Sequence, residues 1–181
     1  SKYANLFPSV HFTYKLPKEN ALQISYSRRI RRPRYDELSP FVTFSDNRNF
    51  FSGNPQLNPE FSHAFDMGHI KYFEKGSLTS SIYYRHTTDK ILSIRRVDNN
   101  GFATSKPENL TVEDAFGAEF TSQYTIQKWW KLDFNINFFR AITEGANIED
   151  NIGSDTYSWF ARQTSRFSLP HKIDFQIRAN Y

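Results

Sequence analysis

Apolar and polar side chains alternate at every position from Lys131 to Phe138. Because successive side chains of a strand point to opposite faces, this pattern predicts a β-strand with one apolar face and one polar face. The same alternation returns along the chain and predicts about eight strands. We expect them near residues 8–16, 21–27, 61–73, 78–97, 112–126, 131–138, 157–168 and 173–181.

The predicted strands are joined alternately by short turns and by long polar connections. Short turns are expected near residues 18, 75, 129 and 170, and longer connections near 29–60, 87–110 and 143–156. Four prolines in the first long segment argue against central strands there: Pro33, Pro40, Pro55 and Pro59. Asp98-Asn99-Asn100-Gly101 is a hairpin signal, and the return passes a looser stretch at 106–109. Short turns on one rim and long loops on the other are typical of outer-membrane β-barrels.

Composition supports half-buried strands more than a packed core. Hydrophobic residues make up 38% of the 181 residues, aromatic residues 17%, and the mean hydropathy is -0.67. No run approaches the roughly 18 apolar residues of a membrane helix. The polar faces carry Gln, Asn, Thr, Ser and isolated charges, which suits the inside of a wide barrel. Trp129 and Trp130 stand beside a turn, where an interfacial girdle belongs. The predicted fold is all-β: an antiparallel up-and-down meander that forms part of a large transmembrane β-barrel. The alternative is a soluble antiparallel sheet or a lipocalin-like barrel.

The sequence contains no set of residues that indicates catalysis. There is no cysteine, which excludes disulfides, cysteine metal sites and a thiol nucleophile. The five histidines have no metal-binding spacing, and no nucleotide-binding or hydrolase motif is present. Glu149, Asp150 and Asp155 match no calcium loop, so we expect a solvated loop there. We therefore expect no enzymatic activity, no cofactor and no metal.

Five arginines between residues 28 and 34 form the main local concentration of charge. The chain carries a formal net charge of +4 and a pI of about 9.2. Arginine binds carboxylate and phosphate bidentately, so this cluster is a candidate contact for an anionic substrate or for lipopolysaccharide phosphate. The alternative is a loop base that pairs with acids of neighbouring strands. No nucleic-acid-binding fold surrounds the cluster, so no nucleic acid is expected as a partner.

Two segments resemble a known family. Residues 25–41, SYSRRIRRPRYDELSPF, and residues 53–68, GNPQLNPEFSHAFDMG, are similar to segments of TonB-dependent receptors of the Bacteroidetes type. The resemblance implies a bacterial outer-membrane barrel of about 22 strands with a plugged lumen. The N-terminus has no signal peptide, so we expect residues 1–181 to be an interior piece of the barrel domain, without the plug and the remaining strands.

The resemblance implies energised uptake of a scarce nutrient, such as a siderophore complex, a glycan or a peptide. Expected partners are the plug domain of the same chain, TonB through the absent N-terminal part, outer-membrane lipid and lipopolysaccharide. Alternatives are a plug-free porin, an outer-membrane adhesion barrel or a soluble β-sheet binding domain. The candidate substrate- or plug-contacting residues are Arg28, Arg29, Arg31, Arg32, Arg34, Asp66, Arg85, Glu113 and Glu119, and further lumen-face charges are expected at Asp133, Asp174 and Arg178.

Overall fold

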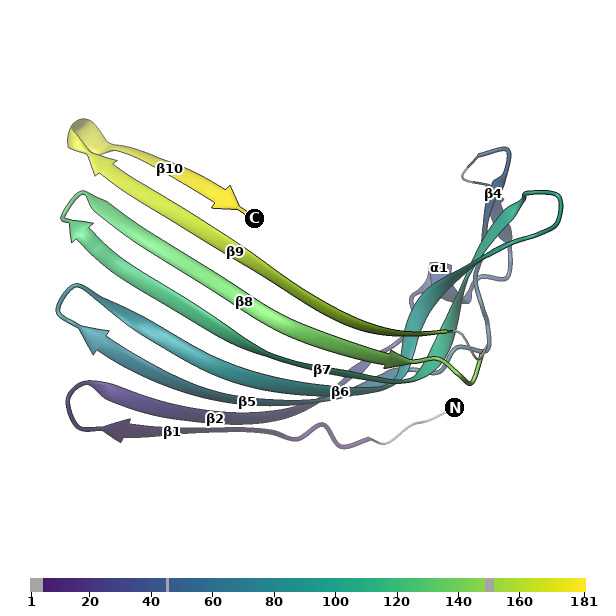
Figure 1. Cartoon of the computed structure of the whole chain (residues 1–181), viewed down its shortest axis with the longest axis horizontal. Coiled ribbons are helices and arrows are strands. Elements are labelled where there is room, and N and C mark those ends of the chain that lie inside the picture. The colour runs from purple at the N-terminus through teal and green to yellow at the C-terminus, as the bar shows by residue number, and fades with distance from the viewer. Residues whose placement is uncertain (1–4, 45, 149–151) are drawn as a thin grey trace.

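The computed structural model describes residues 5–44, 46–148 and 152–181, and it leaves the side chain of Lys172 aside. Its main feature is a curved antiparallel sheet whose short turns lie at one end and whose long connections lie at the other (Figure 1). The first half of the chain contains β1 (Ser9–Leu16), β2 (Asn20–Arg31), α1 (Tyr35–Leu38), β3 (Val42–Phe44), β4 (Asn49–Ser52) and β5 (Glu60–Phe73). The second half contains β6 (Gly76–Val97), β7 (Ala103–Gln127), β8 (Trp130–Glu144), β9 (Gly153–Leu169), the 3₁₀ turn η1 (Pro170–Lys172) and β10 (Ile173–Asn180).

Eight of these strands form the predicted meander, in the order β1-β2-β5-β6-β7-β8-β9-β10. Each strand pairs antiparallel with the next one along this path. The two short strands β3 and β4 lie off this path, in the long connection between β2 and β5. They pair with each other, and β4 also pairs in parallel with the start of β7. The predicted all-β meander is therefore confirmed, with a small extra hairpin in its first long loop.

The register shows that the strands are inclined as in a closed barrel. Asn20 opens β2 directly after its turn, and the row of paired residues that begins there passes through every later hairpin. The row meets Leu78 two residues after β6 begins, Phe134 four residues after β8 begins, and Ala179 six residues after β10 begins. The stagger is thus about one residue per strand. With about 3.3 Å per residue and about 4.8 Å between strands, this stagger inclines the strands by about 35° to the barrel axis.

Two boundaries, the start of β7 and the end of β8, differ most from the sequence prediction. The stretch 106–109, expected to be loose, lies within β7, where Pro107 is paired with Ser93 of β6. Proline is tolerated because β8 ends opposite Val112, which leaves this part of β7 without a β8 neighbour. β8 itself runs beyond residue 138 to Glu144. By contrast, all four prolines of the 29–60 segment lie outside strands, as predicted.

One face of the sheet is apolar yet exposed. A representative row contains Phe12, Ile24, Met67, Ile82, Ala118, Phe138 and Trp159. Met67 is 48% exposed and Ile82 60% exposed. Among the described residues, the only buried hydrophobic side chains are Ala21, Leu57, Ile91, Ala103 and Leu110. The sheet therefore has no protein core of its own, and its apolar face requires an external apolar medium.

Aromatic rings gather on this face near the short turns. The Trp130 and Phe167 ring centroids lie 5.6 Å apart, and those of Phe167 and Phe175 lie 4.6 Å apart. Trp129 stacks against Trp130 at 6.1 Å. Such rings form the interfacial girdles of membrane barrels. No described helix is long and apolar enough to span a membrane.

Candidate functional site

The polar face of the sheet carries a chain of contacts across three strands. Tyr83 of β6 donates a hydrogen bond to the side-chain oxygen of Asn137 on β8, at 3.1 Å. Its ring crosses over Gly117 of β7, where an added Cβ would come within 2.8 Å of the ring. The guanidinium of Arg85 lies 4.8 Å from the centre of the same ring. The absence of a side chain at Gly117 thus lets one aromatic ring connect neighbouring strands on the face that lines a barrel lumen.

Four of the other predicted lumen-face charges also contact neighbouring strands. Glu119 accepts a hydrogen bond from the amide of Asn135, which also donates to Thr121 at 2.9 Å. Asp66 accepts a 3.4 Å hydrogen bond from Ser25. Lys90 and Glu113 form an ion pair at 3.0 Å. Asp133 pairs with Arg166 at 3.2 Å. The polar face is therefore rich in charges already bonded across strands, and a substrate or plug contact at these residues stays a prediction.

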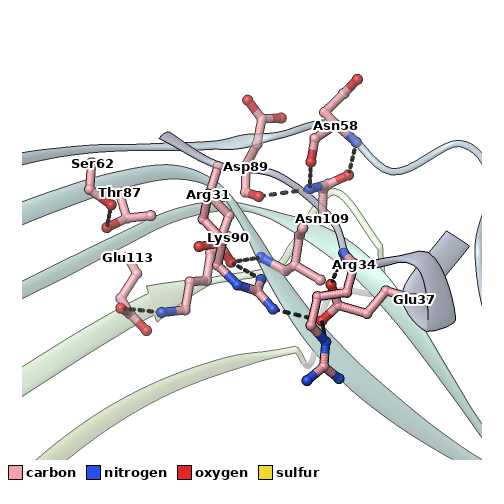
Figure 2. A network of polar contacts seen from close by, with 12 residues as sticks. Arg31, Arg34, Glu37, Asn58, Ser62, Thr87, Asp89, Lys90, Asn109 and Glu113 are labelled. Atoms are coloured by element: carbon pink, nitrogen blue, oxygen red, sulfur yellow. Dashed lines mark hydrogen bonds and ion pairs between the residues drawn. The ribbon is translucent and has the colours of Figure 1, made fainter. Parts of the chain in front are cut away.

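A denser network fixes the base of the long β2–β5 connection (Figure 2). The guanidinium of Arg31 bridges two carboxylates, at 2.6 Å from Glu37 and 2.9 Å from Glu60. Glu60 is only 5% exposed, and it also accepts a hydrogen bond from the backbone N–H of Ile91 at 2.7 Å. One carboxylate thus connects the end of β2, the start of β5 and the middle of β6. A buried carboxylate needs such partners to remain charged.

Glu37 fixes the short helix α1 within this network. Its second carboxylate oxygen accepts the backbone N–H of Arg34 at 2.8 Å, which closes the first turn of the helix. The backbone carbonyl of Glu37 accepts the N–H of Asn54 at 2.6 Å. The chain at Gly53 approaches so closely that an added Cβ would lie 2.4 Å from the carbonyl oxygen of Ser39. The two segments that carried the family resemblance therefore contact each other here.

Asn109 of β7 completes the loop base. Its amide donates to the carbonyl oxygens of Asn58 and Asp89, at 3.1 Å and 2.7 Å, and its side-chain oxygen accepts the N–H of Asn58 at 2.8 Å. Asn54 reaches the carbonyl of Pro107 at 3.2 Å. Sequence reasoning missed Glu37, Glu60 and Asn109, although Glu37 and Glu60 stand inside the resemblance segments. We call Arg31, Glu37, Gly53, Glu60 and Asn109, with their bonded neighbours, the loop base.

The five arginines do not form one site. Arg31 and Arg34 are paired with acids, Arg34 with Asp36 at 2.8 Å, which is the arrangement that the loop-base alternative expected. Arg28 lies over the Phe61 ring at 5.2 Å. Arg29 and Arg32 have no ion-pair partner among the described residues, and Arg32 lines a separate pocket. Whether any of the five contacts an anionic ligand or the plug stays a prediction.

The structure gives no support to a cation site in the loop before β9. Glu149 and Asp150 lie outside the described residues. Asp155 forms a bidentate ion pair with Arg140, at 2.7 Å and 2.6 Å. Within the described parts of the chain, no three histidine, aspartate or glutamate side chains gather as a metal site.

Comparison with known proteins agrees with this architecture. The model of the outer membrane protein beta-barrel family matches residues 1–181. The chain belongs to this family. Its members occupy the bacterial outer membrane. No protein of curated function matches the sequence at a significant level.

Solved structures share the fold at low sequence identity. The siderophore receptor PirA from Pseudomonas aeruginosa superposes with a TM-score of 0.71 and 13% identity, over 97% of this chain and 33% of that one. A mutant of the ferric enterobactin receptor PfeA from Pseudomonas aeruginosa gives 0.63 and 14%, over 97% and 27%. The copper transporter OprC gives 0.60 and 21%, over 88% and 24%. The chain thus spans a third or less of these proteins, and the expected resemblance to a receptor barrel is confirmed.

Proposed function

We propose that this chain is a wall segment of a TonB-dependent receptor that takes up a scarce nutrient across the outer membrane. The observation that carries the proposal is the staggered eight-strand wall, because its inclination suits a wide barrel and its polar face suits a lumen filled with water and protein. The match of almost the whole chain to a siderophore receptor supports it. A ferric siderophore or a copper ion is a suitable cargo class, because the similar structures are two siderophore receptors and a copper transporter.

In this proposal the two faces have separate partners. The apolar face contacts lipid and lipopolysaccharide, and the polar face contacts the plug domain of the same chain. We expect Arg85, Glu113 and Glu119 of the polar face to meet the plug or the passing nutrient, beside their contacts with neighbouring strands. TonB acts on the plug from the periplasm. No covalent bond of the nutrient changes, so the protein needs no catalytic residue.

The proposal is tested with the full-length protein in an outer-membrane host. We expect heat-modifiable migration on gels and uptake of a siderophore or metal complex that stops when TonB is deleted. Uptake that continues without TonB would identify a plug-free porin instead. A folded barrel that supports no uptake, but binds cells or surfaces, would identify an adhesion barrel. Soluble protein with no heat shift would mean that the apolar face covers a protein core.

A specific variant pair links the polar face to transport. Arg85→Gln removes a positive charge from the polar face of β6. Lys71→Gln removes a positive charge from the apolar face of the neighbouring strand β5 and serves as the control. We expect only the first to lower uptake while both proteins fold. Equal uptake by both variants would remove Arg85 from the candidate site.

A further inference from the structure

The apolar face of the sheet changes character between two neighbouring register rows near the long-loop end. The row nearer the short turns is aromatic, because Tyr26 pairs with Phe65 and Phe65 pairs with Tyr84. Side chains two residues apart in a strand share a face. The next row on this face therefore contains Arg28, His63, His86 and Asp114. An apolar row is thus followed directly by a polar one.

Two tyrosine hydroxyls of the aromatic row are bonded to the polar row. The Tyr26 hydroxyl lies 2.9 Å from Nδ1 of His63. The Tyr84 hydroxyl donates to the Asp114 carboxylate at 2.6 Å, and Nδ1 of His86 lies 2.8 Å from the same carboxylate. Tyrosines at a membrane boundary keep the ring in the apolar layer and the hydroxyl toward water. The direction of these hydroxyls indicates that the apolar layer ends between the two rows.

The length of the strands gives the same boundary. Arg28 lies eight residues from the short-turn end of β2, and His63 and His86 lie ten residues from the short-turn ends of β5 and β6. With about 3.3 Å per residue and an inclination of about 35°, these residues lie about 22–27 Å from that end along the barrel axis. The apolar band of outer-membrane barrels is about 25 Å tall, and their long loops are extracellular. In such a barrel the polar row lies at the level of the outer-leaflet headgroups.

Arg28 is a cation of this row without a carboxylate partner. Among the residues that the structure describes, no acid forms an ion pair with it, and its Nε is buried without a hydrogen-bond partner. One terminal nitrogen donates a 3.4 Å hydrogen bond to the carbonyl of Leu6, and the guanidinium lies 5.2 Å from the centre of the Phe61 ring. A guanidinium at the edge of an apolar layer is stabilised by an anion. The described part of the chain provides none at Arg28.

We propose that Arg28 and His63 bind a phosphate group of lipopolysaccharide, the phosphorylated glycolipid of the outer leaflet. The proposal rests on the outer-membrane barrel of the proposed function and is independent of the nutrient. Arg28 supplies several charge-assisted donors to the phosphate oxygens. When Tyr26 donates its hydroxyl proton to Nδ1 of His63, the neutral imidazole carries its own proton on Nε2. That N–H can donate to the same phosphate.

The rows nearer the short turns provide the surface for the acyl chains. Phe65, Ile24 and Met67 lie on the same face as Arg28, and all three side chains are exposed. An acyl chain that descends from a phosphate at Arg28 therefore meets apolar side chains. The two acids of this face nearby do not oppose the phosphate, because Asp114 is bonded to its own strand neighbours and Asp155 is paired with Arg140.

The test measures lipid retained by the full-length protein after transfer to mixed micelles that contain equal amounts of lipid A and dephosphorylated lipid A. Native mass spectrometry counts the bound lipids. We expect the unmodified protein to retain lipid A preferentially. R28Q should lower that retention about tenfold, the usual consequence of losing a charge-assisted contact. H63L should lower it about threefold, because a neutral hydrogen bond contributes less.

R29Q is the matched control, because Arg29 also has no ion-pair partner among the described residues but points to the opposite face of β2. R29Q should retain lipid A like the unmodified protein. Equal retention by R28Q and the unmodified protein, or an equal loss in R29Q, would overturn the proposal. So would equal retention of phosphatidylglycerol and lipid A, because the site would then accept any phosphate headgroup. Heat-modifiable migration separates these outcomes from a failure of the barrel assignment, which would abolish the heat shift in the unmodified protein.

Discussion

The wall of the sheet and the loop base are stabilised in opposite ways. In the wall, contacts repeat from strand to strand in one register, and few apolar side chains are buried within the described residues. In the loop base, contacts do not repeat: Glu60 connects three segments far apart in sequence, and Gly53 fits a single gap. A repetitive region tolerates change at many positions provided that each face keeps its character. A region of unique contacts fails when one group is removed.

The largest expected effect comes from placing a charge on the lipid-facing side of the wall. Ile82→Arg exposes a guanidinium to the bilayer near the middle of the apolar row, which costs about 2–4 kcal/mol in membrane barrels. Ser81→Arg places the same charge one residue away on the polar face, opposite Glu119 in register. We expect loss of heat-modifiable protein from the outer membrane only for I82R. Equal loss for both variants would show that the polar face is not a lumen.

The wall was predictable from sequence, and the loop base was not, for a physical reason. The alternation of apolar and polar residues indicates which face of the sheet each side chain occupies. Leu132, Phe134 and Ile136 therefore predict a strand even when the neighbouring strand is unknown. The stagger of the hairpins also follows once the pairing is known. Glu60, by contrast, shows nothing in its local pattern that reveals Arg31 or Ile91 as partners.

The arginine cluster shows the same limit in another form. Five arginines within seven residues suggest one basic patch. Arg28 and Arg29, however, are consecutive residues of β2, so their side chains point to opposite faces of the sheet. The end of the strand and α1 then direct Arg31 and Arg34 into ion pairs. Sequence proximity therefore indicates charge density but does not indicate a shared site.

The next largest effect is expected from Glu60→Ala in the loop base. The change removes the acceptor for Arg31 and for the Ile91 N–H and leaves a buried donor unpaired, at a cost of about 2–3 kcal/mol. The control Asp36→Ala removes an ion pair whose two side chains are 59% and 68% exposed, and should cost less than about 1 kcal/mol. Urea titration of the heat-modifiable band measures both. A larger cost for D36A than for E60A would contradict this account.

Glycine substitutions sharpen the comparison with a change of one methyl group. Gly53→Ala forces a Cβ to within 2.4 Å of the Ser39 carbonyl oxygen, and we expect a loss of about 1–2 kcal/mol together with faster proteolysis of residues 33–59. Gly68→Ala in the wall meets only ordinary contacts, with Ser81 at 3.6 Å. It should be neutral or slightly stabilising, because alanine reduces the freedom of the unfolded chain. Similar proteolysis rates in the two variants would place the loop base outside the rigid part of the protein.

A smaller effect is expected on the polar face of the wall. Tyr83→Phe removes the hydrogen bond to Asn137 but keeps the ring over Gly117, so we expect a loss of about 1 kcal/mol in the same urea titration. Tyr72→Phe provides the control, because the Tyr72 hydroxyl has no hydrogen bond to any described residue. A loss as large as that of E60A would mean that the wall also depends on unique contacts.

The smallest effect concerns the turn between β3 and β4, outside the membrane, and it depends on pH. The backbone N–H of Arg48, then the side chain of Asn49, hold the pKa of the Asp46 carboxyl below its usual value. A depressed pKa means that these bonds stabilise the turn above the unfolded carboxyl pKa of about 3.9 and are lost as pH falls through the lower folded value. We expect the hydrogen-exchange protection factors of the Arg48 and Asn49 amides to fall below about pH 4, while amides of β5 remain protected. Protection at Arg48 that persists in D46A at neutral pH would show that the carboxylate does not hold this turn.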